Sequence, residues 1–146
     1  MPKLYSDLKF TGHVTVALNG KVVQEIPNLV VTDGKEYAVS RMKDGSMNAM
    51  SHMAVGTSTT AAAASQTALL GEAARVELTS TSVSGSTVTY IATFPTGTPS
   101  SLTGLNEAAI FNASTGGTML CRTVFAGVVN KDTTDAMTVT WAITAS

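Results

Sequence analysis

The stretch Ala136–Thr144, with the sequence AMTVTWAIT, decides the fold class of this chain. Its apolar residues alternate with small or polar ones: Met137, Val139, Trp141 and Ile143 against Thr138, Thr140, Ala142 and Thr144. Period-two alternation is typical of a strand with one buried and one wetter face. Threonine is β-branched and suits a pleated surface that water or a partner still reaches. The sequence therefore predicts a closing strand that buries the only tryptophan.

Composition indicates one domain with few charges. The chain has 146 residues, of which 44% are hydrophobic and 13% charged. That length suffices for a single core over residues 1–146. The charged share is about half of the quarter usual for soluble chains. Such a surface suits contact with other protein surfaces, but a small β-domain with a threonine-rich exterior has the same composition.

Several function classes conflict with the sequence. The net charge is −1 and the Lys and Arg residues are scattered, so nucleic-acid binding is not expected. No apolar run reaches the roughly 20 residues of a membrane span. The start, MPKLYSDLKF, lacks the apolar core of a signal peptide, so we expect synthesis in a cytosol. A single cysteine, Cys121, excludes an internal disulfide and is expected to be a small buried hydrophobe.

The first third of the chain predicts a hairpin and then a helix. His13–Leu18 and Lys21–Ile26 flank Asn19-Gly20, a dipeptide that accepts the positive φ of a tight turn, and Pro27 ends the pairing. A short helix is expected over residues 33–43. Thr32 or Asp33 is its expected cap, Asp33 and Glu36 have capping-box spacing, and Asp44-Gly45 closes it.

The middle of the chain predicts a strand and a long loop. His52–Gly56 is a short apolar strand, and residues 57–67, TSTTAAAASQT, form a low-complexity surface loop. Ala and Leu favour a second brief helix over Ala68–Ala74.

The remaining segments predict further strands: Arg75–Ser80, Thr87–Phe94, Leu105–Phe111, Met119–Phe125 and the closing strand. Leu105–Phe111 also reads as helix, but its short length between turn signals favours strand. Strands at intervals of about 8–12 residues indicate an all-β fold, mainly an antiparallel β-sandwich, jelly-roll-like, with one short helix. The expected core residues are Val88, Tyr90, Phe94, Phe125, Val139 and Trp141.

No catalytic or metal-binding pattern stands out. His13 and His52 have no second ligand at metal spacing, and no serine sits in a G-x-S-x-G elbow. Cys121 lies within a predicted strand, away from a helix N-terminus that would activate it. The carboxylate pairs, Glu72 with Glu77 and Asp132 with Asp135, do not indicate a glycosidase cleft. We therefore expect no enzyme activity, no cofactor, no metal and no small-molecule substrate.

Four methionines cluster at Met42, Met47, Met50 and Met53. Methionine fills irregular gaps and also adapts to partners. The cluster therefore fits two interpretations: packing of the helix on a sheet, which we favour, or a pliable contact patch between subunits.

Three stretches resemble virion proteins of tailed bacteriophages. They are NLVVTDGKEYAVSRM (Asn28–Met42), SHMAVGTSTTAAAASQTALLGE (Ser51–Glu72), and LNEAAIFNASTGGTMLCRTVF (Leu105–Phe125) followed by MTVTWAIT. Together they cover most of the chain from Asn28 on. The chain departs from the pattern at Ala109 and Ser58, where glycine is usual, and these departures concern local backbone geometry.

The resemblance implies a non-enzymatic building block of the virion. Because the chain lacks collagen-like repeats and a heptad shaft, we expect a capsid decoration (cement) protein on the outer capsid surface. Its expected partners are the major capsid protein and copies of itself, as a dimer or trimer. The alternative is a short tail-fibre or fibre-attachment subunit, and a glycan-binding module is a third class.

Two segments are expected to contact the partners. One is an N-terminal arm, residues 1–10, and the other is the loop over residues 57–67. The candidate contact residues are Pro2, Lys3, Leu4, Tyr5, Phe10, Thr57, Ser58, Thr59 and Thr60. An arm that orders on docking loses entropy but covers much surface.

Overall fold

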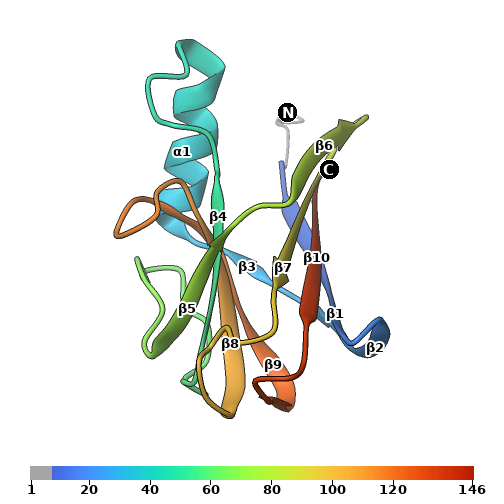
Figure 1. Ribbon diagram of the computed structural model, residues 1–146. Coiled ribbons are helices and arrows are strands. Elements are labelled where there is room, and N and C mark those ends of the chain that lie inside the picture. The colour runs from blue at the N-terminus through green and yellow to red at the C-terminus, as the bar shows by residue number, and fades with distance from the viewer. Residues whose placement is uncertain (1–7) are drawn as a thin grey trace.

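Two five-stranded antiparallel sheets face each other in the computed structural model, which describes residues 8–146 (Figure 1). Sheet A has the strand order β2–β1–β10–β7–β6, and sheet B the order β3–β9–β8–β4–β5. The elements are β1 Phe10–Leu18, β2 Lys21–Pro27, β3 Leu29–Val30, α1 Thr32–Lys43, β4 His52–Gly56, β5 Glu72–Glu77, β6 Ser80–Ser84, β7 Thr87–Phe94, β8 Thr103–Phe111, β9 Met119–Lys131 and β10 Met137–Ala145. The prediction of an all-β fold with one short helix is confirmed.

The closing strand β10 lies at the centre of sheet A, between β1 and β7. Its four large apolar side chains are buried, and the side chains between them are only partly covered. The partly covered face is rich in threonine, and two cross-strand hydroxyl pairs join its strands. Thr87 and Thr144 lie 2.7 Å apart, and Thr93 and Thr138 lie 3.1 Å apart. The predicted alternation of β10 is confirmed.

The first hairpin forms where the sequence predicts it. Asn19 has a φ of 52° and Gly20 a φ of 80°, the positive values that a tight turn between twisted strands needs. Pro27 is the last residue of β2, opposite His13. The predicted strand over Leu105–Phe111 is also confirmed, as β8.

The helix α1 lies against sheet B, beside β9 (Figure 1). Gly34 permits the approach, because a Cβ there would overlap the backbone carbonyl of Leu120. The predicted cap is wrong: Val31 is the N-cap, and no side chain caps the helix. Backbone geometry replaces the capping box, since the Val31 N–H donates to Leu120 O and the Thr32 N–H donates to Ala64 O.

Two other expectations are wrong. Ala68–Ala74 forms no helix, because its last residues pair with β4 as the start of β5. Arg75–Ser80 is not one strand, because the chain crosses between the sheets at Leu78 and Thr79. Leu78 N–H donates to Ser51 O beside sheet B, and Thr79 N–H donates to Ile91 O in sheet A.

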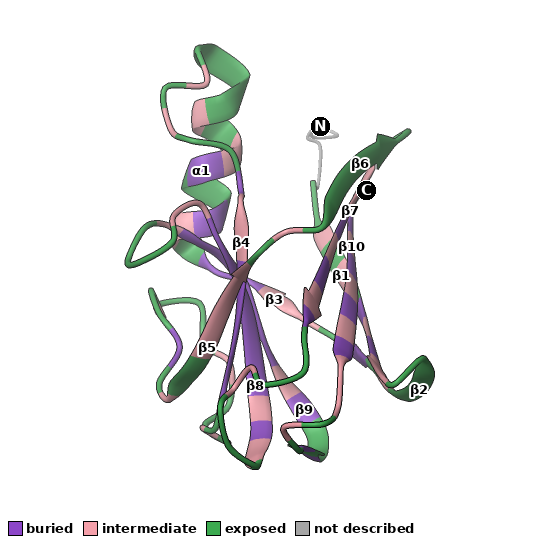
Figure 2. Ribbon diagram, in the orientation of Figure 1, coloured by how far each residue is buried: buried purple, intermediate pink, exposed green. Residues whose placement is uncertain are grey.

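The core fills the space between the sheets (Figure 2). Of the expected core residues, five are buried there: Tyr90, Phe94, Phe125, Val139 and Trp141. The sixth, Val88, is only partly buried, because it lies at the start of β7 and lines a small apolar cavity beneath α1. Strand β9 also continues past Phe125 to Lys131, whose buried ammonium donates to Pro95 O at 2.9 Å. Burial lowers the pKa of Lys131.

Candidate functional site

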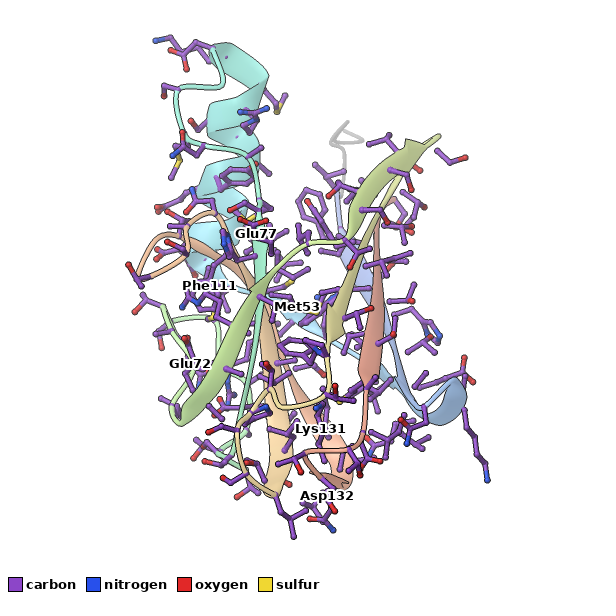
Figure 3. All side chains as sticks on the ribbon, viewed as in Figure 1. Met53, Glu72, Glu77, Phe111, Lys131 and Asp132 are labelled. Carbon is purple, nitrogen blue, oxygen red and sulfur yellow. The ribbon has the colours of Figure 1, made fainter. Side chains whose placement is uncertain are left out.

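In the described part of the chain, sheet B is covered on both faces, whereas sheet A is covered on its inner face only. The inner face of sheet B joins the main core, where Met53 points toward sheet A. Its outer face carries a second, smaller core around Phe111 (Figure 3). The members of this second core are Val31, Ala54, Leu69, Ala109, Phe111 and Met119. Leu69 belongs to the segment 57–71, here called the covering loop, which has no helix or strand.

A buried ion pair lies beneath the covering loop. Glu107 of β8 and Arg122 of β9 are both fully buried, with 3.0 Å between Arg122 Nη2 and Glu107 Oε1. A second bond runs from Arg122 Nε to the same oxygen at 3.2 Å. Removing two charges from water is costly unless each is paired and hydrogen-bonded, so the remaining contacts of the pair matter.

Those remaining contacts go to the covering loop. Glu107 accepts backbone N–H bonds from Ser58 at 3.0 Å, Leu70 at 3.1 Å and Gly71 at 2.8 Å. The Glu107 carboxylate therefore accepts hydrogen bonds from both ends of the covering loop and holds these ends together. We call Glu107 and Arg122 with their loop contacts the clamp.

Arg122 completes the clamp from the other side. Its Nη1 donates to Thr60 O at 2.8 Å and to Gln66 Oε1 at 3.2 Å. Gln66 in turn donates to Ala61 O and accepts from the Ala63 N–H, so it braces the alanine run. The Arg122 guanidinium therefore donates hydrogen bonds both to the covering loop and to Glu107.

The glycine at the end of β4 makes room for the clamp. A Cβ at Gly56 would lie 2.5 Å from Glu107 Oε2 and 2.5 Å from Gly71 O. A side chain at this position would displace either the carboxylate or the opposite end of the loop. The glycine in the sequence AVGT is thus explained by close approach.

A second arginine, Arg75, holds the turn between β8 and β9. Arg75 of β5 binds Glu72 at 2.7 Å and stacks on the ring of Phe111, with 3.7 Å from its guanidinium carbon to the ring centre. It also donates to Ala113 O and Gly116 O, both at 2.9 Å. Such charge-assisted bonds fix a turn that has no strand pairing of its own.

The clamp changes the interpretation of the predicted contact residues. Thr57, Thr59 and Thr60 have exposed side chains, and Ser58 is half-buried, but the backbone of this loop is held rather than free. Phe10 opens β1 and packs against the core, so it is part of sheet A and not of an arm. Pro2, Lys3, Leu4 and Tyr5 lie outside the described residues.

A separate apolar groove lies between α1 and the residues at the start of β1 and in β3. Its volume is about 450 Å³. The main apolar residues that line it are Leu8, Phe10, Leu29, Ala38, Val39 and Met42. Three of them are largely exposed: Leu8 is 64% exposed, Val39 65% and Met42 83%. Phe10, Val30 and Ala38 also line a smaller apolar cavity of about 120 Å³ under the helix.

Sequence reasoning did not predict this groove, because the apolar residues of the helix lie on two different faces. Tyr37 points into the core, whereas Val39 and Met42 point away from it. The methionine cluster is divided in the same way. Met50 and Met53 are buried and Met47 packs on the core, so packing explains these three, but Met42 is exposed in the groove. The spacing of Val39 and Met42, three residues apart, was the available signal.

The other polar candidates, His13, His52 and Cys121, lie apart from the clamp and the groove. His13 lies 3.3 Å from Glu25 on the surface, and Ser51 Oγ lies 2.7 Å from His52 Nδ1. Neither histidine lines the grooves described above. Within residues 8–146, no three His, Cys, Asp or Glu side chains gather as metal ligands would. Cys121 is fully buried, and burial raises the pKa of its thiol, which keeps it protonated.

Comparison with known proteins identified no relative. No protein-family model, curated protein or solved structure matched the chain. Over the residues described, no helix has the length and apolar character needed to cross a membrane.

Proposed function

We propose that this chain is a structural protein of a tailed-bacteriophage particle, a decoration protein that binds on the outer capsid surface and bridges major capsid protein subunits. The resemblance of three stretches to phage virion proteins suggests the setting. The observation that carries the docking part of the proposal is the exposed apolar groove between α1 and the start of sheet A.

The groove has the chemistry of a protein-binding surface. Burying a large apolar side chain contributes roughly 1.5–3 kcal/mol, so Leu8, Val39 and Met42 offer a substantial driving force if a partner covers them. Lys35 also lines the groove, and none of its described lining residues is acidic. The occupant that fits is an apolar segment of the capsid protein flanked by acidic residues.

The rigid sandwich supports a bridging role. The groove combines one helix with the ends of two strands, and the helix packs on β9 of sheet B, so the docking surface is continuous with the core. Repetition of a modest contact over a symmetric shell supplies avidity that a single contact lacks. The protein would stabilise the shell by joining neighbouring subunits.

The test uses particles of the phage that encodes the chain, produced with its gene deleted. Purified chain is added, and its binding is measured by co-sedimentation with the heads. The double variant V39D/M42D should lose binding, because it places two charges in the apolar groove. The matched control is L102D: Leu102 is 66% exposed but lies outside the groove, so this variant should bind normally.

Heating the same particles tests the stabilising role. Heads that carry the chain should retain their DNA, inaccessible to nuclease, to a higher temperature than heads without it. Equal heat resistance combined with failed adsorption to host cells would support the tail-fibre alternative and contradict the proposal. Equal binding of V39D/M42D and L102D would refute the groove as the docking surface.

A further inference from the structure

The outer edge of β6 differs from the other three sheet edges. An open strand edge presents unpaired backbone groups, and proteins commonly protect such edges with charges, proline, register breaks or short length. Strand β2 has Lys21, Pro27 and a register shift in its pairing with β1. Strand β5 has Glu72, Arg75 and Glu77 and a shift in its pairing with β4. Strand β3 has only two residues.

Strand β6 has none of these protections. Its sequence is STSVS, and all five residues are exposed (Figure 2). The chain has no charged residue from Leu78 to Asn106, a stretch that includes β6 and its neighbour β7. Val83 is 74% exposed, although it lies opposite Val88. Among residues 8–146 no strand pairs with the outer side of β6, and an uncharged edge strand with an exposed valine is a template for another strand.

The hairpin geometry indicates which backbone groups are unpaired. Ser84 and Thr87 close a turn whose two central residues are Gly85 and Ser86. In a two-residue hairpin the closing pair is hydrogen-bonded, and hydrogen-bonded pairs then alternate along the ladder. The backbone groups of Ser80, Ser82 and Ser84 therefore point to β7. Those of Thr81 and Val83 point outward.

We propose that β6 pairs with β6 of a second copy of this chain, antiparallel and across a twofold axis at Ser82. This register overlaps all five residues. Thr81 lies opposite the partner's Val83, and each of the two such pairs exchanges two backbone hydrogen bonds. Ser82 lies opposite the partner's Ser82. The two copies of sheet A then form one continuous sheet.

The occupant is a second copy because a twofold pairing is neutral here and repulsive at β5. In an antiparallel pairing of β5 with itself, full overlap places Glu72 opposite Glu77 at both ends, and like charges directly opposite are destabilising. The same arrangement of β6 joins only serine, threonine and valine. Serine and threonine also hydrogen-bond across strands. This inference does not depend on a role in a virion.

Cysteine crosslinking tests the register. Ser82 and the partner's Ser82 form a non-hydrogen-bonded pair, with a Cα separation of about 4.5 Å. That separation lies within the range of a disulfide. S82C should therefore form a covalent dimer under mild oxidation, whereas the native Cys121 is buried and does not compete. The control is S100C, at an exposed serine in the loop before β8. Crosslinking of S82C no faster than that of S100C would overturn the proposal.

Charge exchange provides an independent measurement. S82K and S82E each place like charges together at the axis, so each should sediment as a monomer at concentrations where the native chain dimerises. An equimolar mixture of S82K and S82E should restore the dimer, because opposite charges then meet. A native chain that stays monomeric throughout the concentration series, or a mixture that does not associate, contradicts the β6 pairing. Circular dichroism of each variant verifies that sheet content is unchanged.

Discussion

Sheets A and B have the same number of strands, but their outer faces are opposite in character. Sheet B is covered by a loop that a buried ion pair holds in place. Sheet A presents a row of partly covered threonines that no described segment overlies. The difference shows that the charged residues Glu107 and Arg122 serve to hold a loop on one sheet, whereas the other sheet has no such device on its outer face in the described part of the chain.

The composition of the covering loop explains why it needs a polar clamp. The sequence TSTTAAAASQT contains no large apolar side chain, so burial of this segment gains little from the hydrophobic effect. Leu69 is the main apolar anchor, at the end of the loop. Hydrogen bonds to a buried carboxylate and guanidinium then fix the backbone, and charge-assisted bonds are about twice as strong as neutral ones.

The largest expected effect is the loss of the clamp charge. E107Q should destabilise the fold by about 3–5 kcal/mol, because it leaves the Arg122 charge buried without a counter-charge. E25Q removes the exposed partner of His13 and should cost less than about 1 kcal/mol. Urea unfolding measures both. Equal losses would mean that the clamp contributes no more to stability than an exposed ion pair.

Limited proteolysis examines the same variant locally. Thermolysin cleaves before large apolar residues and should cut the native loop slowly, because Leu69 is buried and the exposed Leu70 has its backbone N–H bonded to Glu107. In E107Q the bonds at Leu69 and Leu70 should become accessible under native conditions. Unchanged cleavage in E107Q would show that Leu69 and Arg122 suffice to hold the loop.

The next effect compares two adjacent leucines at the end of the covering loop. Leu69 is buried against the second core, whereas Leu70 is 54% exposed. L69A should therefore cost about 2–3 kcal/mol, and L70A less than about 0.5 kcal/mol. The measurement is again the midpoint of urea unfolding, provided that the dependence of the unfolding free energy on urea concentration is the same in both variants. A larger loss for L70A would contradict the burial of the second core.

A smaller effect compares the two faces of β10. V139T places a hydroxyl in the main core and should cost about 1–2 kcal/mol. T140V changes the outer face of sheet A and should stay within about 0.5 kcal/mol. Thermal unfolding of the two variants separates them. Equal destabilisation would show that the threonine face packs against something in solution.

The smallest effect is on acid stability. The backbone N–H of Asp132 and the side-chain amide of Asn19 lower the pKa of the exposed Asp135 carboxyl. Its stabilising contribution is therefore complete above the unfolded pKa of about 3.9 and disappears as the pH falls through the lower folded value. Stability of the native chain should fall more steeply below pH about 4 than that of D135N, as urea midpoints would show. Parallel curves would exclude this contribution.

Alternation made most strands predictable, since a period of two repeats in β1, β7 and β10 whatever they pack against. The helix was predictable from its composition, but its orientation was not. Whether Tyr37 or Val39 is buried depends on where β9 lies. The four apolar residues of the helix, Tyr37, Ala38, Val39 and Met42, do not specify which face is buried.

The clamp could not be predicted, because Glu107 and Arg122 are far from the loop in sequence. Each sits in a strand where charge is unusual, and that was the one available signal. Sequence patterns specify neighbours two to four residues apart, whereas this site joins β4, β8, β9 and the loop.

The amino-acid sequence by itself determined the strand-rich class, the first turn and the buried face of the closing strand, because these depend on local geometry and period. Only the tertiary structure decided that the low-complexity loop is held, that the helix leaves Val39 and Met42 uncovered, and that β6 ends a sheet without protection. Those outcomes depend on which distant strands become neighbours, and burial and charge pairing act only after that arrangement exists.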